Sequence, residues 1–432
     1  MLYISSNSKR KYQSQMGKPK FAILLLWVLC ILCIILHLNV EARVSSHLER
    51  EIEAKLKQLN KPAVKTIKSE DGDIIDCINI YDQPTFNHPA LKNHTIKAMP
   101  DFLVESKNSS SEDEETLTFQ TWQKSGRCPK GTIPVRRILK EDLLRATSLN
   151  HFGRKPPEVL KNSTNAFNHN FSNSNSEFIP KNRSSAYLVT MGYNYVGAQA
   201  DINVWNPKVT QPDDFTTAQI WLKNDNNPYF ESVESGWMVN PKLYGDGATR
   251  FFAYWTTDSY NSKGCFDLTC SGFVQTGQVV LGGALEPISS HFGLQYSLNV
   301  GLFLEPDSGN WYLKIKNNIA VGYWPAEILG SLRHSAILVQ WGGQVSSTNI
   351  KKVTPHTKTQ MGSGDFASGR FQNACFMQNV RIKDYSLQLK YPQYVSAMAE
   401  EPYCYSALNV ADYGKEPIFY FGGPGQSPNH CP

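Results

Sequence analysis

The chain has 432 residues, and 41% of them are hydrophobic, which is enough to bury the core of one large all-β domain beside a smaller module. The formal net charge at pH 7 is +5, but residues 1–42 hold five basic residues and one acidic residue, so the remainder is nearly neutral. No basic patch or stripe stands out in that remainder, and nucleic acid is therefore excluded as a partner.

Residues 1–42 are typical of a secretory signal peptide. A basic stretch precedes the apolar run 21–38, which only His37 interrupts, and the following Val40-Glu41-Ala42 resembles a signal cleavage site. The run also approaches the length that crosses a bilayer, so an uncleaved signal anchor is the alternative, and membrane association is expected only in that case. Cleavage is favoured and predicts a secreted, extracellular protein.

Residues 43–150 are predicted to form a small helical or mixed module. A capping-box pair, Ser46 and Glu49, begins a helix that ends near residues 60–62, and its apolar residues share one face: Leu48, Ile52, Leu56 and Leu59. A Ser/Glu-rich stretch at 106–116 indicates a solvated loop, and the segment 136–144 again shows helical spacing. Because so short a helix is marginal alone, this module needs a partner surface.

The composition changes sharply at 151–185, where Asn, Ser and His dominate without apolar periodicity. This pattern predicts an exposed polar linker, the kind of segment in which proteolytic processing occurs. Five glycosylation sequons lie between the signal and residue 185, as expected of exposed chain in a secreted protein: Asn93, Asn108, Asn162, Asn170 and Asn182.

From residue 186 to residue 432, short strands follow one another. The runs 198–205, 295–300 and 311–316 alternate with period two, and Gly, Pro and Asn separate them. Only a short stretch near 325–332 favours a helix. Regularly spaced strands with little helix predict an antiparallel β-sandwich over 186–432, so the expected fold class is mainly β.

Seven cysteines follow the signal segment, and in a secreted protein they should form disulfides with one thiol left over. The expected pairs flank a short turn, bracket the C-terminal tail and join two parts of the N-terminal module: Cys265–Cys270, Cys404–Cys431 and Cys77–Cys128. Cys375 lies in a strand-like run and is expected to be a buried, unreactive thiol. None of these seven cysteines has the paired two-residue spacing of a zinc site, so neither a metal nor a cofactor is predicted.

Several short motifs resemble those of neprosin-type plant glutamic peptidases. Three of them resemble the activation peptide of that family: DCINIY at 76–81, HPALKNH at 88–94 and CPKGTIPVRR at 128–137. Others resemble its peptidase domain: ESGW at 234–237, CSGFVQ at 270–275, QWGG at 340–343 and GGPG at 422–425. The motifs follow the family's order with compatible spacing, and together they extend from the N-terminal module to the end of the chain.

The resemblance implies a secreted proenzyme with a β-sandwich endopeptidase domain. It implies two catalytic glutamates on neighbouring strands, acidic working conditions, and cleavage of Pro-containing peptides or proteins after proline. The first glutamate maps onto Glu234, and the second belongs where this chain has Gln344. Residues 43–150 are then the pro-region, which is expected to cover the cleft as an intramolecular inhibitor. Acid should release it by neutralising carboxylates that pair with Arg136, Arg137 and Lys140.

Gln344 decides which chemistry is open to this site. Two carboxyl groups close together share one proton, so that one acts as base while the other donates a hydrogen bond. A glutamine amide can donate to an oxyanion, but it cannot transfer a proton. If Glu234 is the base, the Glu/Gln pair can hydrolyse peptides. If position 344 supplies the base, the protein is an inactive pseudo-peptidase that binds Pro-rich peptides or cell-wall proteins.

A third hypothesis is a carbohydrate-binding sandwich whose aromatic residues stack on sugars, because a fold by itself does not assign a function. The sequence contains no Gly-x-Ser-x-Gly elbow and no His-Glu-x-x-His motif, so serine and zinc hydrolases lack support.

Overall fold

The computed structural model describes residues 46–100, 118–156, 182–226, 229–316, 318–351, 353–428 and 430–432. The predicted signal segment, the Ser/Glu-rich stretch and the sequons at Asn108, Asn162 and Asn170 lie outside these ranges. The chain divides into two units, Met1–Lys55 and Leu56–Pro432. In the described ranges, no helix is both long enough and apolar enough to cross a membrane.

Residues 46–59 are helical, as the capping box and the apolar spacing predict. The helix begins in the first unit and ends in the second, where the Asn60 N–H donates to the Leu56 carbonyl at 2.7 Å. The Asn60 side chain then bonds both backbone groups of Ile138, at 2.7 Å and 2.9 Å. A long-range contact therefore reinforces the stop that the local sequence predicts.

Three strands form a small antiparallel sheet in the order β1-β2-β4: β1 (Ala63–Lys68), β2 (Ile74–Asn79) and β4 (Thr132–Arg136). Its apolar side chains pack with Trp122 and with Val280 from a later part of the chain. Short 3-10 turns and one helix complete this part: Ile80–Asp82, Pro84–Asn87, Pro89–Leu91, Thr121–Lys124 and α3 (Lys140–Arg145). The module predicted as helical or mixed is therefore mixed.

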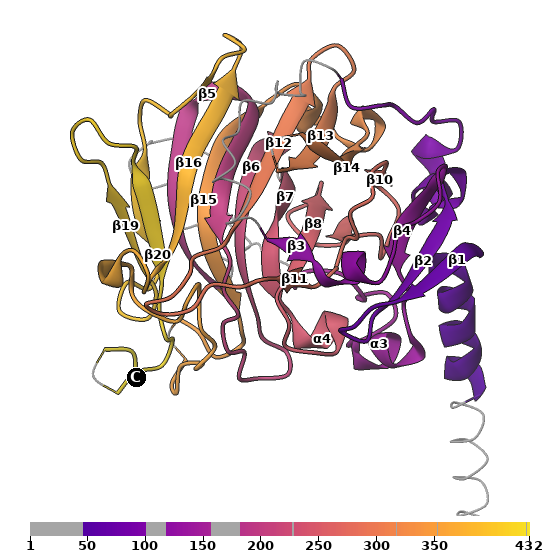
Figure 1. Ribbon diagram of the computed structural model, residues 1–432, viewed down its shortest axis with the longest axis horizontal. Helices are drawn as coiled ribbons and strands as arrows, with labels where there is room; N and C mark the ends of the chain where they lie inside the picture. Colours follow the sequence, from indigo (N-terminus) through magenta and orange to yellow (C-terminus); the bar gives the residue numbers. More distant parts are fainter. Residues whose placement is uncertain are drawn as a thin grey trace, which may run out of the picture. The chain divides into compact units, whose positions relative to one another are not determined.

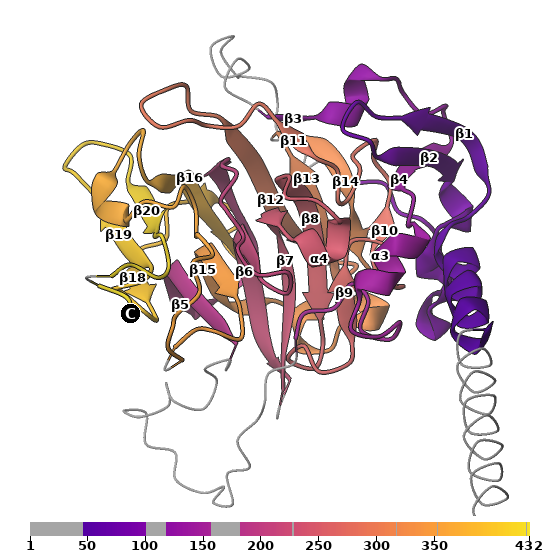
Figure 2. The same ribbon diagram turned by 90° about the horizontal axis from the view of Figure 1, so that it is seen from below.

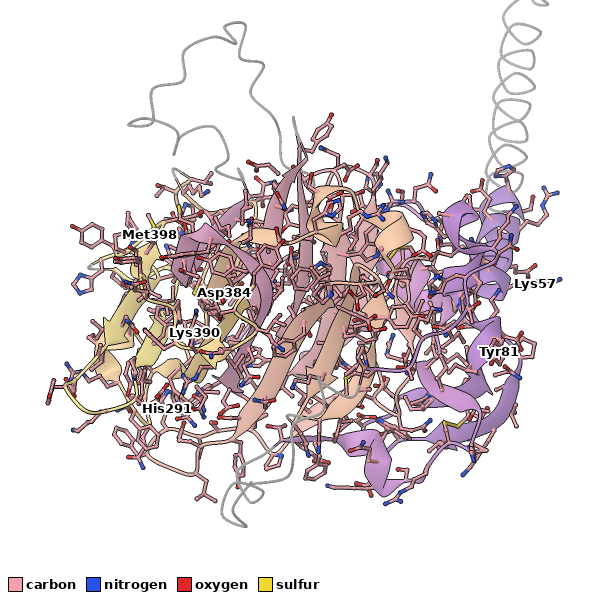
Figure 3. All side chains as sticks on the ribbon, turned by 90° about the horizontal axis from the view of Figure 1, so that it is seen from above. Lys57, Tyr81, His291, Asp384, Lys390 and Met398 are labelled. Atoms are coloured by element: carbon pink, nitrogen blue, oxygen red, sulfur yellow. A yellow bond between two sulfur atoms is a disulfide. The ribbon has the colours of Figure 1, made fainter. Side chains whose placement is uncertain are left out.

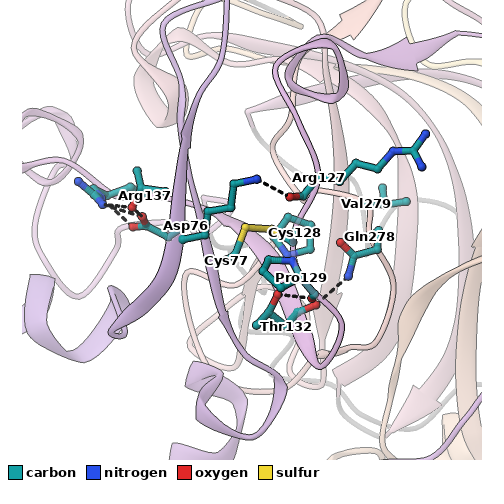
Figure 4. Close-up of a disulfide and its surroundings, with 12 residues drawn as sticks. Asp76, Cys77, Arg127, Cys128, Pro129, Thr132, Arg137, Gln278 and Val279 are labelled. Carbon is teal, nitrogen blue, oxygen red and sulfur yellow. Dashed lines mark hydrogen bonds and ion pairs between the residues drawn. A yellow bond between two sulfur atoms is a disulfide. The ribbon is translucent and has the colours of Figure 1, made fainter.

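The Cys77–Cys128 disulfide ties β2 to the segment that leads into β4 (Figure 4). Beside it, Lys65 Nζ donates to the Arg127 carbonyl at 3.0 Å, and Gln278 Nε2 donates to the Thr132 carbonyl at 2.7 Å. The remaining bridges and the one free, buried cysteine of the described residues are the expected ones: Cys265–Cys270, Cys404–Cys431 and Cys375. The predicted pairing is therefore confirmed.

One large antiparallel sheet dominates the rest of the second unit, with the main order β10-β14-β13-β12-β5-β15-β6-β7-β8-β9 (Figure 1). The strands of this path are β5 (Arg183–Asn203), β6 (Phe215–Asn226), β7 (Tyr229–Val239), β8 (Arg250–Thr256), β9 (Gly264–Phe266), β10 (Val274–Gln275), β12 (Ser297–Glu305), β13 (Asn310–Ile315), β14 (Ile319–Trp324) and β15 (Ala336–Ser346). The strands off the path are β16 (Cys375–Asp384), β17 (Leu389–Lys390), β18 (Ser396–Ala399), β19 (Ser406–Val410) and β20 (Ile418–Gly422).

The long strand β5 lets this sheet curl on itself. Its first half pairs with β15 and β18, and its second half pairs with β12 and β16 (Figure 2). The layers enclose one hydrophobic core, which includes the fully buried indoles of Trp237, Trp311, Trp324 and Trp341. The mainly-β, antiparallel sandwich that the alternating runs predict is therefore confirmed.

Two short helical segments differ from what the local sequence pattern predicts. The stretch near 325–332 forms two 3-10 turns, Ala326–Ile328 and Ser331–Arg333. The sequence analysis missed α4 (Pro241–Tyr244), because four residues are too few for a helical period. Asn240 caps α4 by accepting from the Leu243 N–H at 3.1 Å.

Asp73, which lies just before β2, joins the small sheet to the large one. Its Oδ1 accepts from Arg136 Nε at 3.1 Å, and its Oδ2 accepts from Arg250 Nη1 on β8 at 2.5 Å. Arg137 donates to Asp76, another residue of the pro-region. The prediction that acid releases the pro-region by neutralising the carboxylates paired with Arg136 and Arg137 is therefore wrong, because those carboxylates lie in the pro-region itself. Of the ion pairs that Asp73 makes, the one with Arg250 crosses to the large sheet.

Candidate active site

Glu234 lies in the middle of β7 with its side chain fully buried, and its carboxylate accepts four hydrogen bonds from described residues. Oε1 accepts from Ser232 Oγ at 2.7 Å and from Tyr260 OH at 2.5 Å. Oε2 accepts from Gln219 Nε2 at 2.6 Å and from Lys155 Nζ. A carboxylate with this many donors, one of them cationic, is held in its ionised form.

The strand pattern explains why these donors meet. Ser232 precedes Glu234 by two residues on β7, so both side chains point to the same face. Gln219 of β6 is directly opposite Gly236, where a Cβ would lie only 2.1 Å from the Ala218 carbonyl oxygen. The glycine of the ESGW motif therefore lets β6 and its glutamine approach β7 closely.

Lys155 Nζ forms an ion pair with Glu234, and both side chains are 0% exposed. Its Nζ also lies 4.6 Å, 5.1 Å and 5.7 Å from the ring centroids of Tyr254, Tyr260 and Phe266. An ammonium within about 6 Å of an aromatic face is attracted by the ring's quadrupole. The buried lysine is thus held by one carboxylate and three rings.

Burial acts on the two pKa values of this pair in opposite ways. It lowers the pKa of Lys155 to about 8, although the nearby Glu234 charge opposes that change. Burial alone would raise the pKa of Glu234, but the Lys155 charge and the hydrogen bonds from Lys155 and Tyr260 hold it below the ordinary value of 4.5. The pair is therefore ionic at neutral pH.

Residues 151–156 are not the exposed linker that their composition predicts. Phe152 is 4% exposed, Lys155 is 1% exposed, and a cavity of about 260 Å³ beside them is lined by Phe215, Asn240 and Phe266, among others. The prediction of an exposed linker is therefore wrong for these residues. A polar or charged side chain can be buried where aromatic rings and a carboxylate surround it, and the first residues of 151–185 meet such partners.

The backbone of 152–156 is also fixed. The Gly153 carbonyl accepts from the Phe266 N–H at the edge of β9, at 2.7 Å. The Lys155 N–H donates to Tyr254 OH at 3.4 Å, and the Pro156 carbonyl accepts from Arg183 Nη2 at the start of β5. These contacts hold the segment in place over Glu234.

Replacing Gly153 by alanine should loosen this segment. The residue has φ +73°, and an added Cβ would lie 1.9 Å from Thr269 Oγ1. Gly72→Ala is the matched control, since Gly72 has φ +92° and open space around its Cβ position. We expect hydrogen exchange at 152–155 to accelerate by about tenfold or more in Gly153→Ala only. Equal protection in both variants would show that Gly153 does not hold the segment.

Gln344 lies on β15, directly opposite Ser185 of β5 and Thr217 of β6. Its Nε2 donates to Ser185 Oγ at 3.1 Å, and its Oε1 has no hydrogen-bond partner among the described residues. Directly opposite residues of antiparallel strands share a face, as do residues two apart on one strand. Through Thr217, Gln219 and Trp221 on β6, this rule places Gln344 and Glu234 on the same face of the sheet.

The expected placement on neighbouring strands is nevertheless wrong, because β6 lies between β7 and β15. Glu234 is opposite Trp221, whereas Gln344 is opposite Thr217, further along β6. No hydrogen bond joins Glu234 to Gln344 in the described part of the chain. The side chain that lies between them on β6, and that contacts Glu234, is Gln219.

Gln219 and Thr217 are site residues that the sequence analysis missed. Gln219 Oε1, Thr217 Oγ1 and Gln344 Oε1 are all buried without a hydrogen-bond partner among the described residues. Buried polar atoms are normally satisfied, so a ligand that carries polar groups fits this row. The signal was present in 217–220, where Thr and Gln alternate with Ala and Ile and give β6 a polar face as well as a core face.

A second carboxylate, Glu400, lies beyond Gln344 in the same row. The Ser185 N–H donates to Glu400 Oε2 at 3.3 Å, and Lys351 Nζ lies 3.3 Å from the same oxygen. Burial raises the pKa of Glu400 above its ordinary value, although the Lys351 charge opposes this. A carboxylate therefore borders the Gln344 end of the row, on the other side of Ser185.

The glycosylation sequons and a histidine–cysteine cluster form two further groups of candidate residues. Asn93 and Asn182, the two described sequon residues, are exposed, and glycosylation of the five sequons stays a prediction. A cluster of His356, Cys404 and Cys431 has the proximity of metal ligands, but its two cysteines form a disulfide. That cluster therefore does not offer thiolates to a metal ion.

Two family descriptions match the chain. Residues 66–179 match the family described as Neprosin activation peptide, and residues 212–424 match the family described as Neprosin. Lys155 falls in the first range, whereas Gln219, Glu234 and Gln344 fall in the second.

Similar solved structures include Scytalido-glutamic peptidase with a peptide-based transition-state analogue, at 10% identity over 56% of this chain and 98% of that chain, with a TM-score of 0.31. SCP-B, of the Eqolisin family of peptidases, is 9% identical over 56% of this chain and 96% of its own, with a TM-score of 0.29. A family 16 glycoside hydrolase endo-glucanase from Bacteroides ovatus is 9% identical over 39% and 69%, with a TM-score of 0.24. At such TM-scores these likenesses decide nothing about the site.

Proposed function

Because the chain belongs to the neprosin family, we propose that it is the precursor of a glutamic-type endopeptidase in which Glu234 is the reactive carboxylate. The observation that carries this proposal is the enclosure of Glu234 by Gln219, Ser232 and Tyr260 of the large-sheet part and by Lys155 of the activation-peptide segment. Its substrates are Pro-containing peptides or proteins. The three disulfides favour secretion, because such bridges persist in oxidising compartments.

In the released protein, Glu234 acts as the general base. It takes a proton from a water molecule while the water oxygen attacks the scissile carbonyl carbon, and it returns that proton to the amine as the C–N bond breaks. The amides of Gln219 and Gln344 can donate hydrogen bonds to the oxyanion, but neither can carry the proton. Loss of Lys155 removes the nearby charge and one hydrogen bond that lower the pKa of Glu234, so this pKa rises toward the acidic working range.

Residues 151–156, which directly follow the pro-region, inhibit the site through Lys155. Its ammonium occupies the Oε2 side of Glu234, where an attacking water would have to be activated. The bound segment also engages the edge of β9 and Arg183, which lie within reach of a peptide in the same cleft. The precursor is inert because the base is paired with a cation and covered.

One observation favours the alternative, a pseudo-peptidase that binds Pro-rich peptides or cell-wall proteins without cutting them. Gln344 stands where the family resemblance expects the second catalytic glutamate, and its amide has no exchangeable proton for catalysis. Both proposals use the same face of the sheet. They differ only in whether Glu234 suffices as the base without a second carboxylate.

Acid should release residues 152–156 from Glu234. The docked Glu234 has a pKa below 4.5, so the released state binds more protons in the acidic range, and docking weakens as pH falls through that range. The Lys155 pKa of about 8 lies below the ordinary 10.5, so the docked state gains relative stability as pH rises between these values. Hydrogen exchange at 152–155, corrected for intrinsic rates, should lose protection below about pH 4.5.

The catalytic proposal is tested on a precursor with a specific protease site inserted between residues 157 and 181. After cutting and acidification, mass spectrometry of a Pro-rich protein substrate should find new termini that follow proline, and the uncut precursor should produce none. If the cut, acidified protein yields no product at any pH, the pseudo-peptidase is the correct description. Lys155→Met is the control for the acid step, since it removes the charge that depresses the pKa of Glu234.

A further inference from the structure

We infer that Glu234 and the rings of Tyr254, Tyr260 and Phe266 form a subsite for a primary ammonium group, which takes the lysine side chain of a peptide bound in the cleft. The inference deepens the proposed function, because it rests on Glu234 lying in the substrate cleft. Once residues 151–156 have left, a lysine of another peptide can occupy the place of Lys155, and such a peptide then blocks Glu234 as Lys155 does.

The enclosure fits a compact cation. Lys155 Nζ bonds Glu234 Oε2 and lies 4.6–5.7 Å from the three ring centroids, and neither charged side chain is exposed. A buried carboxylate without a cationic partner is unfavourable, so an ammonium group that takes the place of Lys155 gains the full ion-pair interaction with Glu234. The three rings add a cation–π attraction that an uncharged group of the same shape lacks.

The selectivity comes from Glu234 rather than from a broadly negative surface. Arg183 stacks on Tyr260 with its Cζ 4.3 Å from the ring centroid, and its charge, like that of Lys223, opposes a proton on Lys155. Two cations therefore border the pocket. A ligand cation is accepted there because it pairs directly with the Glu234 carboxylate, and replacing that carboxylate by an amide should remove most of the preference for a cation.

The backbone contacts define the peptide that can deliver such a lysine. The carbonyl two residues before the lysine meets the Phe266 N–H, the lysine N–H meets Tyr254 OH, and the following carbonyl meets Arg183. The first of these positions must be glycine, because a Cβ at Gly153 would lie 1.9 Å from Thr269 Oγ1. The ligand class is thus a peptide of the pattern Gly-x-Lys that turns at the glycine, where Gly153 has φ +73°, and that bonds one backbone N–H of β9.

The test uses the full chain with Lys155→Ala, which leaves out the three carbons and the ammonium that n-propylammonium supplies. Titration calorimetry should show that this variant binds n-propylammonium with a Kd on the order of 1 mM, at least about tenfold tighter than the uncharged n-propanol. The wild-type chain, whose pocket Lys155 fills, should bind neither. Lys155→Ala with Glu234→Gln should lose most of its preference for the amine over the alcohol, because only the rings then favour the cation, and Arg183 and Lys223 oppose it.

Two results would overturn the inference: equal binding of amine and alcohol by Lys155→Ala, or an undiminished amine preference in the double variant. If Lys155→Ala does not fold, a cycle of Lys155→Met, Glu234→Gln and the double variant decides the matter by exchange protection at 152–155. The double variant should be better protected than Lys155→Met alone, because it leaves no buried unpaired carboxylate. Equal protection would count against the subsite.

These readouts require no hydrolysis. A protein that binds the amine selectively but never cuts a peptide retains the subsite and refutes the catalytic proposal. A protein that cuts peptides but does not distinguish the amine from the alcohol retains the catalytic proposal and refutes the subsite.

Discussion

Replacing Glu234 by glutamine is expected to lower the rate of peptide hydrolysis by the processed protein by about 10³-fold or more. Glutamine keeps the size and the neutral hydrogen-bonding capacity of a protonated carboxyl, but it cannot take a proton from water. No other carboxylate is hydrogen-bonded to Gln219, Ser232 or Tyr260 at this position in the described structure. The measurement is the initial rate on a Pro-containing fluorogenic peptide from about pH 7 to about pH 2.

Glu231→Gln is the matched control for this variant. Glu231 lies on the same strand, is 1% exposed, and accepts from the backbone N–H groups of Gly330 and Leu332 at 2.8 Å each, on the other face of β7. It changes a buried carboxylate without touching the proposed site, so the rate per folded molecule should stay near that of the wild type. Fast cleavage by Glu234→Gln would remove Glu234 from the mechanism.

Replacing Gln344 by glutamate is expected to raise the rate by about 10²-fold, because it restores a partner that can exchange a proton. The new carboxyl would be buried and would share Ser185 with Glu400, and both conditions favour its protonated form at acidic pH. The pH profile should therefore gain a second titrating group. Rates of the wild type and the variant, measured over the same pH range, test this.

Gln388→Glu adds the same charge on the exposed hairpin between β16 and β17, beside the pair formed by Asp384 and Lys390 at 2.7 Å (Figure 3), and should leave the rate unchanged. If Gln344→Glu has no effect on an active wild type, the second carboxylate is not the proton carrier. If activity appears only in Gln344→Glu, the natural protein is a pseudo-peptidase.

The local sequence determined most of the fold because its signals are short-range. Alternation with period two in 198–205 and 311–316 is a property of single strands, and both runs lie largely in strands of the sandwich. The three disulfides also follow from position along the chain, since each pair brackets a turn, a tail or a module. Motif order was sufficient to locate Glu234 and Gln344 in the chain.

Tertiary structure alone decided how these residues act. Strand order is a long-range property, so the sequence did not show that β6 separates Glu234 from Gln344 and places Gln219 between them. Likewise, a lysine in an Asn- and Ser-rich stretch is expected in solvent, because burying its charge is costly. Lys155 is buried only because β7, β8, β9 and the loop before β9 bring one carboxylate and three rings around it, and those neighbours are distant in sequence.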